Sequence, residues 1–183
     1  MTANLTVIAG PTAVGKGTVI KRILEEHPEI ALSVSATTRA PRPGEVDGVS
    51  YFFMTKTEFE AKIAQGEMLE WAQVHGDNYY GTPKQPVLDA LASGKQVILE
   101  IDLQGVRQVR QAWPSAKFIF IAPPSWDELV RRLQGRGTET EEQMAKRLET
   151  AKAELAAESE FDFTVVNNEV AECAAEVVEL MKS

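Results

Sequence analysis

The 183-residue sequence has little cysteine or histidine and no long hydrophobic segment. Its single cysteine, Cys173, cannot form an internal disulfide, which excludes a fold that depends on disulfide bonds. The longest uninterrupted apolar run, residues 118–122, is far shorter than the ~20 residues that span a bilayer. No cationic segment precedes the first apolar stretch, as a secretory signal would require. These absences predict a cytoplasmic protein that does not enter a membrane.

The chain also lacks an excess of positive charge. Nineteen lysine and arginine residues stand against 27 acidic residues, which gives a net charge of −8. This balance excludes a uniformly basic surface for nucleic acid, although it is compatible with a local basic pocket. The two histidines, His27 and His75, show no partner pattern that would indicate a metal site. The length and the 44% hydrophobic composition predict one folded domain.

The order of apolar segments predicts an α/β fold. Short runs that are typical of buried strands cover residues 5–9, 97–101, 117–121 and 163–166. Apolar residues at helical spacing cover residues 17–26, 86–93, 106–112, 125–133, 141–157 and 170–181. Ser125 is expected to cap the helix that follows it. This alternation predicts a mostly parallel sheet flanked by helices on both faces.

Residues 35–83 interrupt that rhythm. Residues 32–36 alternate at period two, and residues 51–53 and 68–74 are further strand candidates. A short helix is predicted over residues 58–65. We therefore expect an α/β core of residues 1–34 and 84–183, with a small, mainly β insert of residues 35–83.

A glycine-rich segment joins the first predicted strand to the first predicted helix. It fits the Gly-x4-Gly-Lys pattern of a phosphate-binding loop (P-loop) and consists of Gly10, Pro11, Thr12, Ala13, Val14, Gly15, Lys16, Gly17 and Thr18. Glycines let backbone N–H groups approach phosphate oxygens, the helix N-terminus favours anions, and Lys16 adds positive charge. The Thr18 hydroxyl is the expected metal-side group. The alternative, a glycine-rich turn with an incidental lysine, is disfavoured by the strand–loop–helix context.

Acidic residues end the predicted strand at residues 97–101. In P-loop enzymes an acid at this place meets Mg²⁺, usually through water. Asp102 is the first candidate for this role, and Glu100 is the second. The alternative is an acid that merely ends a strand, which the neighbouring P-loop disfavours for Asp102.

Two arginines predict a lid. Arg136 lies between two glycines, and Arg147 lies on the helix that follows. A glycine-flanked arginine between two helices indicates a mobile segment, at about residues 135–147, that brings charge onto a transferring phosphoryl group. For Arg132 and Lys146 the favoured interpretation is a solvated surface with acidic neighbours.

The insert contains groups suited to a second phosphate. Arg39 and Arg42, with Tyr51 and Tyr80, offer guanidinium forks and phenol hydroxyls of the kind that hold a terminal phosphate. The alternative is that the tyrosines pack the insert and the arginines are solvated.

Glu70 is a candidate for recognising a base. It follows an apolar stretch and precedes Trp71, so partial burial is expected. An ionised carboxylate accepts two hydrogen bonds, which matches the N1–H and 2-amino donors of guanine and not adenine. Ser35 and Thr82 offer hydroxyl contacts to the same base. The alternative for Glu70 is a surface carboxylate at a strand edge.

Together these segments resemble the guanylate kinase family, from about Leu5 to Met181. The resemblance rests on residues 10–18, Ser33-Val-Ser-Ala-Thr-Thr-Arg-Ala-Pro-Arg-Pro-Gly-Glu45, Glu70-Trp-Ala, Asn78-Tyr-Tyr-Gly-Thr82, Ile101-Asp-Leu-Gln-Gly-Val106, Ile119-Phe-Ile-Ala-Pro-Pro124 and Gly135-Arg-Gly-Thr-Glu-Thr140. It implies transfer of the γ-phosphoryl group of ATP to GMP, and some use of dGMP, with Mg²⁺ as cofactor. It further implies an ATP-binding core, a GMP-binding insert and a closing lid. We expect a monomer or a homodimer.

The resemblance also implies a role for each matching residue. The P-loop would hold the ATP phosphates, Arg136 and Asn167 would lie near the adenine, and Asp102 would lie between Lys16, the metal and GMP. The residues implied for GMP are Ser35, Arg39, Arg42, Tyr51, Glu70, Tyr80, Thr82 and Asp102. The residues implied for catalysis are Lys16, Arg136, Arg147 and Asp102.

Two other functions compete with this one. Some scaffold proteins carry a guanylate-kinase-like domain that binds phosphorylated peptides and has lost catalysis, but such domains typically lack a working P-loop. A kinase that prefers another acceptor, such as AMP, is the second alternative, which Glu70 disfavours.

Overall fold

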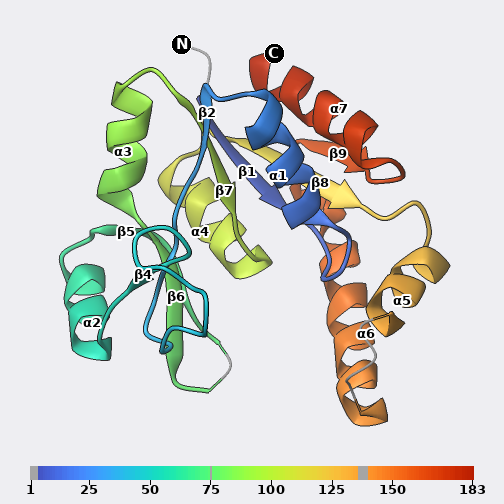
Figure 1. Ribbon diagram of the computed structural model, residues 1–183, viewed down its shortest axis with the longest axis horizontal. Helices are drawn as coiled ribbons and strands as arrows, with labels where there is room; N and C mark the ends of the chain where they lie inside the picture. Colours follow the sequence, from blue (N-terminus) through green and yellow to red (C-terminus); the bar gives the residue numbers. More distant parts are fainter. Residues whose placement is uncertain (1–3, 75, 136–139) are drawn as a thin grey trace.

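The strand predicted at residues 5–9 is β1 (Leu5–Ala9), which the structure places at the centre of the larger sheet (Figure 1). The computed structural model describes residues 4–74, 76–135 and 140–183. The order of this five-stranded sheet is β2–β7–β1–β8–β9, and all neighbouring strands run parallel. The other strands are β2 (Ile30–Leu32), β7 (Gln96–Glu100), β8 (Lys117–Ala122) and β9 (Phe163–Val166). The prediction of a mostly parallel α/β sheet is confirmed.

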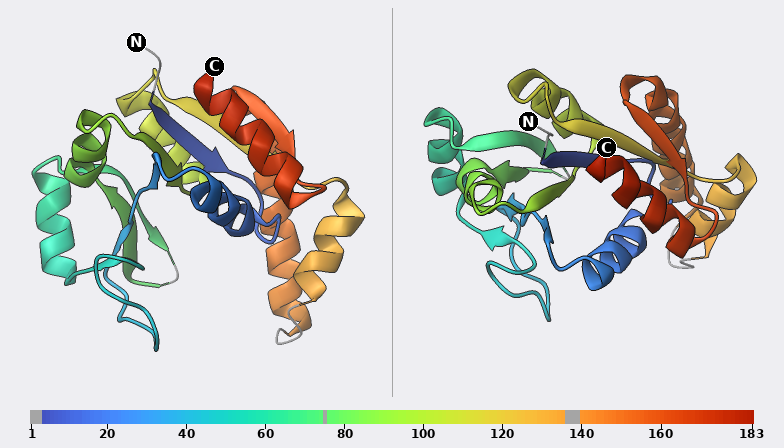
Figure 2. Two further views of the ribbon diagram at one scale, coloured as in Figure 1. Left: turned by 45° about the horizontal axis from the view of Figure 1, so that its top comes forward. Right: turned by 90° about the horizontal axis from the view of Figure 1, so that it is seen from above.

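Helices cover both faces of this sheet, which is why its strands are apolar almost throughout. Seen from above, α1 (Lys16–Glu26) and α7 (Val170–Lys182) lie on one side, and α4 (Leu103–Ala112) lies on the other (Figure 2, right). Side chains of β1 alternate between the two layers: Ile8 packs with the α1 and α7 side, and Val7 with the α4 side.

Helices α5 (Trp126–Gln134) and α6 (Glu141–Ala156) form an arm that extends away from the sheet (Figure 1). Ser125 caps α5, since its hydroxyl accepts a hydrogen bond of 3.1 Å from the backbone N–H of Glu128. This prediction is confirmed. A short 3₁₀ helix (Glu158–Glu160) follows α6 and leads to β9.

A second, smaller sheet stands beside the core, on the opposite side from this arm (Figure 2, left). Its order is β4–β3–β6–β5, and the pairs β3–β6 and β6–β5 are antiparallel. Its elements are β3 (Ala36–Thr37), β4 (Phe52–Phe53), α2 (Lys56–Ala64), β5 (Met68–Val74) and β6 (Asn78–Pro83). Helix α3 (Lys84–Ala92) then returns the chain to the core.

One strand prediction is wrong. The alternation over residues 32–36 comes from the end of β2 and the start of β3, which belong to different sheets. Residues 33–35 cross from one sheet to the other. Strand β6 has no counterpart among the predicted strands, because its tyrosines and glycine follow turn-forming residues. Alternation along the chain does not identify the partner strand, and here Leu32 is exposed although it is apolar.

Ala9 and Glu100, at the carboxyl ends of β1 and β7, line a cavity in the region where open α/β sheets bind ligands. The second sheet bounds the region on one side, and α6 bounds it on the other (Figure 1). Among the described residues, no helix has both the length and the apolar character needed to cross a membrane.

Candidate active site

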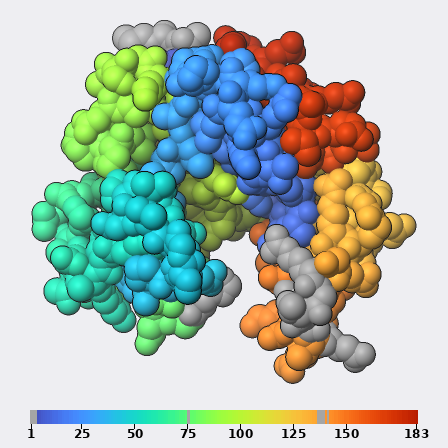
Figure 3. Space-filling view, in the orientation of Figure 1, coloured from blue at the N-terminus to red at the C-terminus, as the bar shows by residue number. Residues whose placement is uncertain are grey.

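Three adjoining cavities run from the P-loop to the second sheet. Their volumes are about 430, 370 and 490 Å³, and Glu100 lines all three. The first cavity shares Thr12 and Lys16 with the third and Ser35 and Tyr51 with the second. The space-filling view shows the hollow between the second sheet and the α5–α6 arm (Figure 3). The site is therefore one cleft with a P-loop end and an insert end.

Backbone geometry at two glycines shapes the P-loop. Gly10 has a φ of 154°, and a Cβ there would lie 2.3 Å from the carbonyl oxygen of Ile121. Gly15 has a φ of 97° and is the residue from which α1 begins. Side chains are disfavoured at both places. Gly15, Lys16, Gly17 and Thr18 line the third cavity, so the N-terminus of α1 lies where a helix can bind phosphate.

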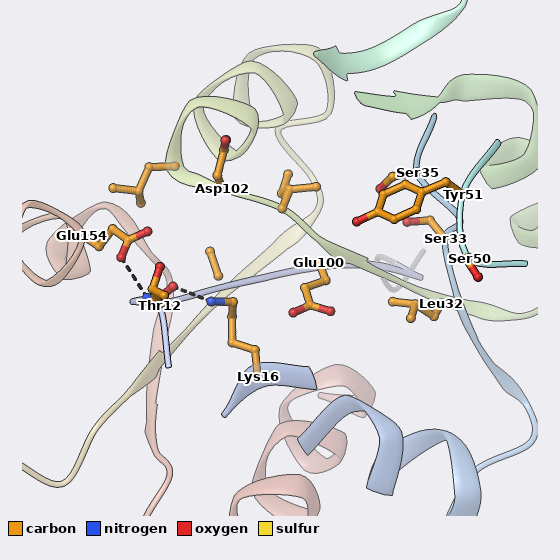
Figure 4. Close-up of a pocket in the computed structure, with 14 residues that line it drawn as sticks. Thr12, Lys16, Leu32, Ser33, Ser35, Ser50, Tyr51, Glu100, Asp102 and Glu154 are labelled. Atoms are coloured by element: carbon orange, nitrogen blue, oxygen red, sulfur yellow. Dashed lines mark hydrogen bonds between the residues drawn. The ribbon is translucent and has the colours of Figure 1, made fainter. Parts of the chain in front are cut away.

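Lys16 lies folded over this loop. Its Nζ donates to the carbonyl oxygens of Gly10, at 2.6 Å, and Pro11, at 3.3 Å. Burial lowers its pKa, while the carboxylates of Glu100 and Glu154 raise it. The positive charge thus lies between the loop and two acids (Figure 4).

Two side chains donate hydrogen bonds to the same backbone carbonyl oxygen of the P-loop. The carbonyl oxygen of Val14 accepts from Asn167 Nδ2 at 2.8 Å and from Arg132 Nη1 at 3.0 Å. Asn167 is almost fully buried, and its amide leaves no room for a Cβ at Gly15. In this structure Asn167 therefore contacts the loop backbone.

The prediction that Arg132 is a solvated surface residue is wrong. Besides Val14, Arg132 Nη2 donates to the carbonyl oxygen of Asn167 at 3.3 Å, and the side chain lines the third cavity. Glu128, one turn earlier on α5, holds its Nε at 2.7 Å. Neighbouring Arg131 is exposed, so the two adjacent arginines differ in environment. The contact between Arg132 and the loop spans 118 residues of the chain, so no local pattern predicts it.

The two acids at the end of β7 and just after it, Glu100 and Asp102, take different places. Glu100 lies between Lys16 and the insert side of the cleft (Figure 4). Burial raises its pKa, and Lys16 opposes that effect. Asp102 is the N-cap of α4: its Oδ1 accepts from the Gly105 N–H at 2.8 Å, and the side chain lines the first two cavities. Of the two candidates, Glu100 is the acid beside the P-loop lysine.

Glu154 of α6 is a site residue that the sequence analysis missed. Its Oε2 accepts from the backbone N–H of Thr12 at 2.9 Å, and it lines the first cavity. Burial raises its pKa, while the hydrogen bond from Thr12 and the charge of Lys16 lower it. The two bonded residues are 142 positions apart, so no sequence signal could have paired them.

The insert end of the cleft gathers the predicted phosphate-binding side chains. Arg39 Nε donates to the Tyr80 hydroxyl at 3.1 Å, and its guanidinium lies 5.4 Å from the ring centre of Tyr51. Arg42 lines the same cavity. Glu45 was not predicted as a site residue. It accepts two hydrogen bonds from Arg39, at 3.0 and 2.8 Å, which lower its pKa.

Glu70 is deeply buried at the same end, with 5% of its surface exposed. The alternative of a surface carboxylate is therefore wrong. Its Oε1 accepts from Thr82 Oγ1 at 2.6 Å. Burial raises the pKa of Glu70 to about 7, the hydrogen bond from Thr82 opposes this, and the charge of Asp102 adds to it. Thr82 is fully buried behind Glu70, whereas Ser35 lines the first two cavities.

The remaining predicted catalytic and metal-binding residues are Arg136, Arg147 and Thr18. Arg147 is half-buried on α6, outside the groups that line the three cavities, and Arg136 lies outside the described residues. Thr18 is exposed and lines the third cavity with Glu100. Within the described residues, no group of three or more His, Cys, Asp or Glu side chains could hold a metal ion.

A P-loop at the carboxyl end of a parallel strand, with a second pocket of arginine and tyrosine beside it, defines a P-loop phosphotransferase. Comparison with known proteins gives the particular family. The family model described as "Guanylate kinase" matches residues 2–183. This chain belongs to the guanylate kinase family and is a nucleoside monophosphate kinase by class.

Individual relatives agree with this assignment. A guanylate kinase of Leifsonia xyli is 60% identical over 97% of this chain and 70% of its own length. One from Nocardia farcinica is 57% identical over 98% of this chain and 94% of its own. The crystal structure of guanylate kinase from Anaplasma phagocytophilum has a TM-score of 0.76 at 31% identity, covering 99% of this chain and 86% of that one.

Proposed function

We propose that this protein transfers the γ-phosphoryl group of ATP to GMP, giving ADP and GDP, and that it also uses dGMP. The observation that carries the acceptor is the buried Glu70 carboxylate in a cavity that adjoins the P-loop cleft. With these nucleotides as substrates, we expect the protein to act in the cytoplasm.

ATP is assigned to the P-loop end. The N-terminus of α1 lines the third cavity, and a helix N-terminus suits phosphate oxygens. Lys16 would exchange its contacts to loop carbonyl oxygens for the outer phosphates. Arg132 lines the same cavity and adds a second positive charge. Asn167 supports the loop through the Val14 carbonyl oxygen, and we assign it to the adenine side of the site.

GMP is assigned to the insert end. Arg39, Arg42, Tyr51 and Tyr80 would hold its phosphate with charged and phenolic donors. The ionised Glu70 carboxylate would accept from the N1–H and 2-amino groups of guanine. A carboxylate buried opposite adenine would lack this donor pair, and a site with unpaired buried polar groups rejects such a base.

Mg²⁺ suits the P-loop end of the cleft. Mg²⁺ in such sites is held mainly by substrate phosphate oxygens, with one or two protein groups. Thr18 and Glu100, which line one cavity, would hold it directly or through water. When bound, the ion neutralises charge on the phosphates. This assignment places Glu100 ahead of Asp102.

The positions of the two ends suit direct transfer. Glu100 and Asp102 each line both the first and the second cavity, so these two cavities adjoin. The acceptor phosphate can therefore approach the P-loop end along the axis of the cleft. We assign Arg136 and Arg147 to the α5–α6 lid, which would close over both nucleotides. Closure would exclude water, which otherwise competes with GMP for the phosphoryl group.

A coupled assay of ADP production tests the function. Purified protein with ATP and Mg²⁺ is given GMP, dGMP, AMP, UMP or CMP, and Lys16→Met serves as the inactive control. Turnover with GMP and dGMP only is the expected result. If the folded protein binds GMP and transfers no phosphoryl group, it is a binding module. Equal turnover with AMP would overturn the role of Glu70.

A further inference from the structure

Helix α4 of the core contacts the insert through a side chain that completes the edge of its sheet. Gln108 Oε1 accepts from the backbone N–H of Trp71 at 3.1 Å, and Gln108 Nε2 donates to the Trp71 carbonyl oxygen at 2.7 Å. Strand β5 is an edge strand, and at Trp71 its backbone N–H and carbonyl groups are bonded to Gln108 of α4. One amide side chain therefore takes the place of a neighbouring strand at the residue directly after Glu70.

One turn earlier on α4, Gly105 leaves room for Glu70 itself. A Cβ at Gly105 would lie 2.7 Å from Glu70 Oε2 and 3.1 Å from its Cδ. Both distances are too short for a side chain to be added without movement. Glycine is a poor helix former, so helix propensity does not explain its place inside α4.

The Glu70 carboxylate has little freedom to move away from that contact. Its Oε1 is bonded to Thr82 on the other side, and the residue is buried. On β6, a Cβ at Gly81 would lie 2.5 Å from the Glu70 carbonyl oxygen, so the backbone of Glu70 is closely packed as well. The carboxylate therefore lies between Thr82 and the α4 backbone.

Gly105 and Gln108 are three residues apart and therefore lie on the same face of α4. We propose that they are positioning residues for guanine selection: Gly105 provides the space for the Glu70 carboxylate, and Gln108 fixes the strand that carries it. The inference rests on the proposed function of Glu70. The inference adds that base selection also depends on α4, a core helix that lies outside the insert proposed to bind GMP.

Calorimetric binding tests this proposal with GMP, inosine monophosphate and ATP as separate ligands. Inosine monophosphate keeps the N1–H of guanine and lacks the 2-amino group, so it reports how well the carboxylate is placed. Gly105→Ala and Gln108→Ala are each expected to weaken the binding of GMP roughly tenfold. The reason is that a displaced Glu70 carboxylate would lose or strain one of its hydrogen bonds with guanine. The preference for GMP over inosine monophosphate should shrink, while ATP affinity stays unchanged.

Matched variants separate positioning from stability. Gln111→Ala makes the same chemical change at an exposed residue of α4 and should leave all three affinities unchanged. Gln108→Met keeps the length of the side chain without its amide and should behave like Gln108→Ala. In a Glu70→Ala background, Gly105→Ala should no longer affect GMP binding, because the carboxylate is absent.

The outcomes distinguish this inference from the proposed function. If Glu70→Gln leaves GMP affinity unchanged, the role of Glu70 itself is refuted, and with it the inference. If Glu70→Gln weakens GMP while the Gly105 and Gln108 variants do not, only the positioning role is overturned. An equal loss of GMP and ATP affinity in the folded Gln108 variants would also overturn it. Should Gly105→Ala fail to fold, the Gln108 variants decide the question.

Discussion

Replacing Glu70 by glutamine should stabilise the unliganded protein while weakening its binding of GMP. Burial raises the pKa of Glu70 from its ordinary value of 4.5 to about 7. The folded state thus holds the proton more tightly than the unfolded chain. The stability that depends on the protonated carboxyl is fully present below pH 4.5 and is lost as pH rises to about 7.

The size of this effect follows from the pKa difference. A change from 4.5 to about 7 corresponds to about 3 kcal/mol of unfavourable free energy once the carboxylate is ionised. Glutamine keeps the acceptor for the Thr82 hydroxyl and carries no charge, but its amide must also be desolvated. At pH 8, Glu70→Gln should therefore gain up to about 3 kcal/mol in the free energy of unfolding.

Urea denaturation at pH 4.5, 6, 7 and 8, followed by circular dichroism without nucleotide, measures this difference. It should grow between pH 4.5 and 7 and then level off. Glu179→Gln removes an exposed carboxylate and should change stability by less than about 0.5 kcal/mol at every pH. A difference that is the same at pH 4.5 and pH 8, or a Glu70→Gln protein that is less stable at pH 8, would refute the reasoning.

The same variant should lose GMP affinity because an amide NH₂ group replaces an acceptor oxygen opposite two guanine donors. Loss of a hydrogen bond to a charged group costs at least about 1.5 kcal/mol, or roughly tenfold in affinity. Calorimetry with GMP at pH 8 measures it, with ATP as the internal reference. Gain of stability together with loss of GMP binding would show a buried charge retained for function at the expense of stability.

Three further results are expected. GMP affinity of the native protein should rise as pH increases through about 7, because Glu70 ionises there, and then level off. Calorimetry with GMP at pH 5.5–8 measures this, and a constant affinity would contradict it. Arg132→Ala should lower kcat/KM for ATP about tenfold or more in the coupled assay, whereas Arg131→Ala, at an exposed position, should change it less than twofold; equal effects would contradict the contact between Arg132 and the loop. Asn167→Ala removes one of two donors to the Val14 carbonyl oxygen and should cost about 1–2 kcal/mol in urea denaturation, and unchanged stability would argue against its support of the loop.

Local patterns were enough to predict several parts of this protein. The P-loop was found because its glycines, lysine and flanking strand and helix are contiguous, and its function depends on backbone N–H groups at one turn. The cap at Ser125 and the buried strands depend likewise on residues within a few positions of each other. The residue types alone left open whether Arg39, Tyr51 and Tyr80 act together on a phosphate. The resemblance to a family favoured this grouping, because it relates segments that lie far apart in the chain.

Contacts between segments that lie far apart in the chain could not be predicted from the sequence. Arg132 of α5 is a site residue only because the P-loop approaches it in the folded chain. Glu154 reaches Thr12 from another helix. Residues 32–36 alternate like one strand, yet they join two sheets. Such differences depend on partners far along the chain, and a local window does not contain them.

Glu70 shows which properties follow from the residue type and which follow from the tertiary structure. Its carboxylate chemistry, and therefore its ability to accept from guanine, is a property of the residue type and is visible in the sequence. Its burial, its bond to Thr82 and the space left by Gly105 come from β5, β6 and α4, which meet only in the folded chain. Residue type decides which interactions are possible, while desolvation and distance, which tertiary structure controls, decide how strong they are and at which pH they operate.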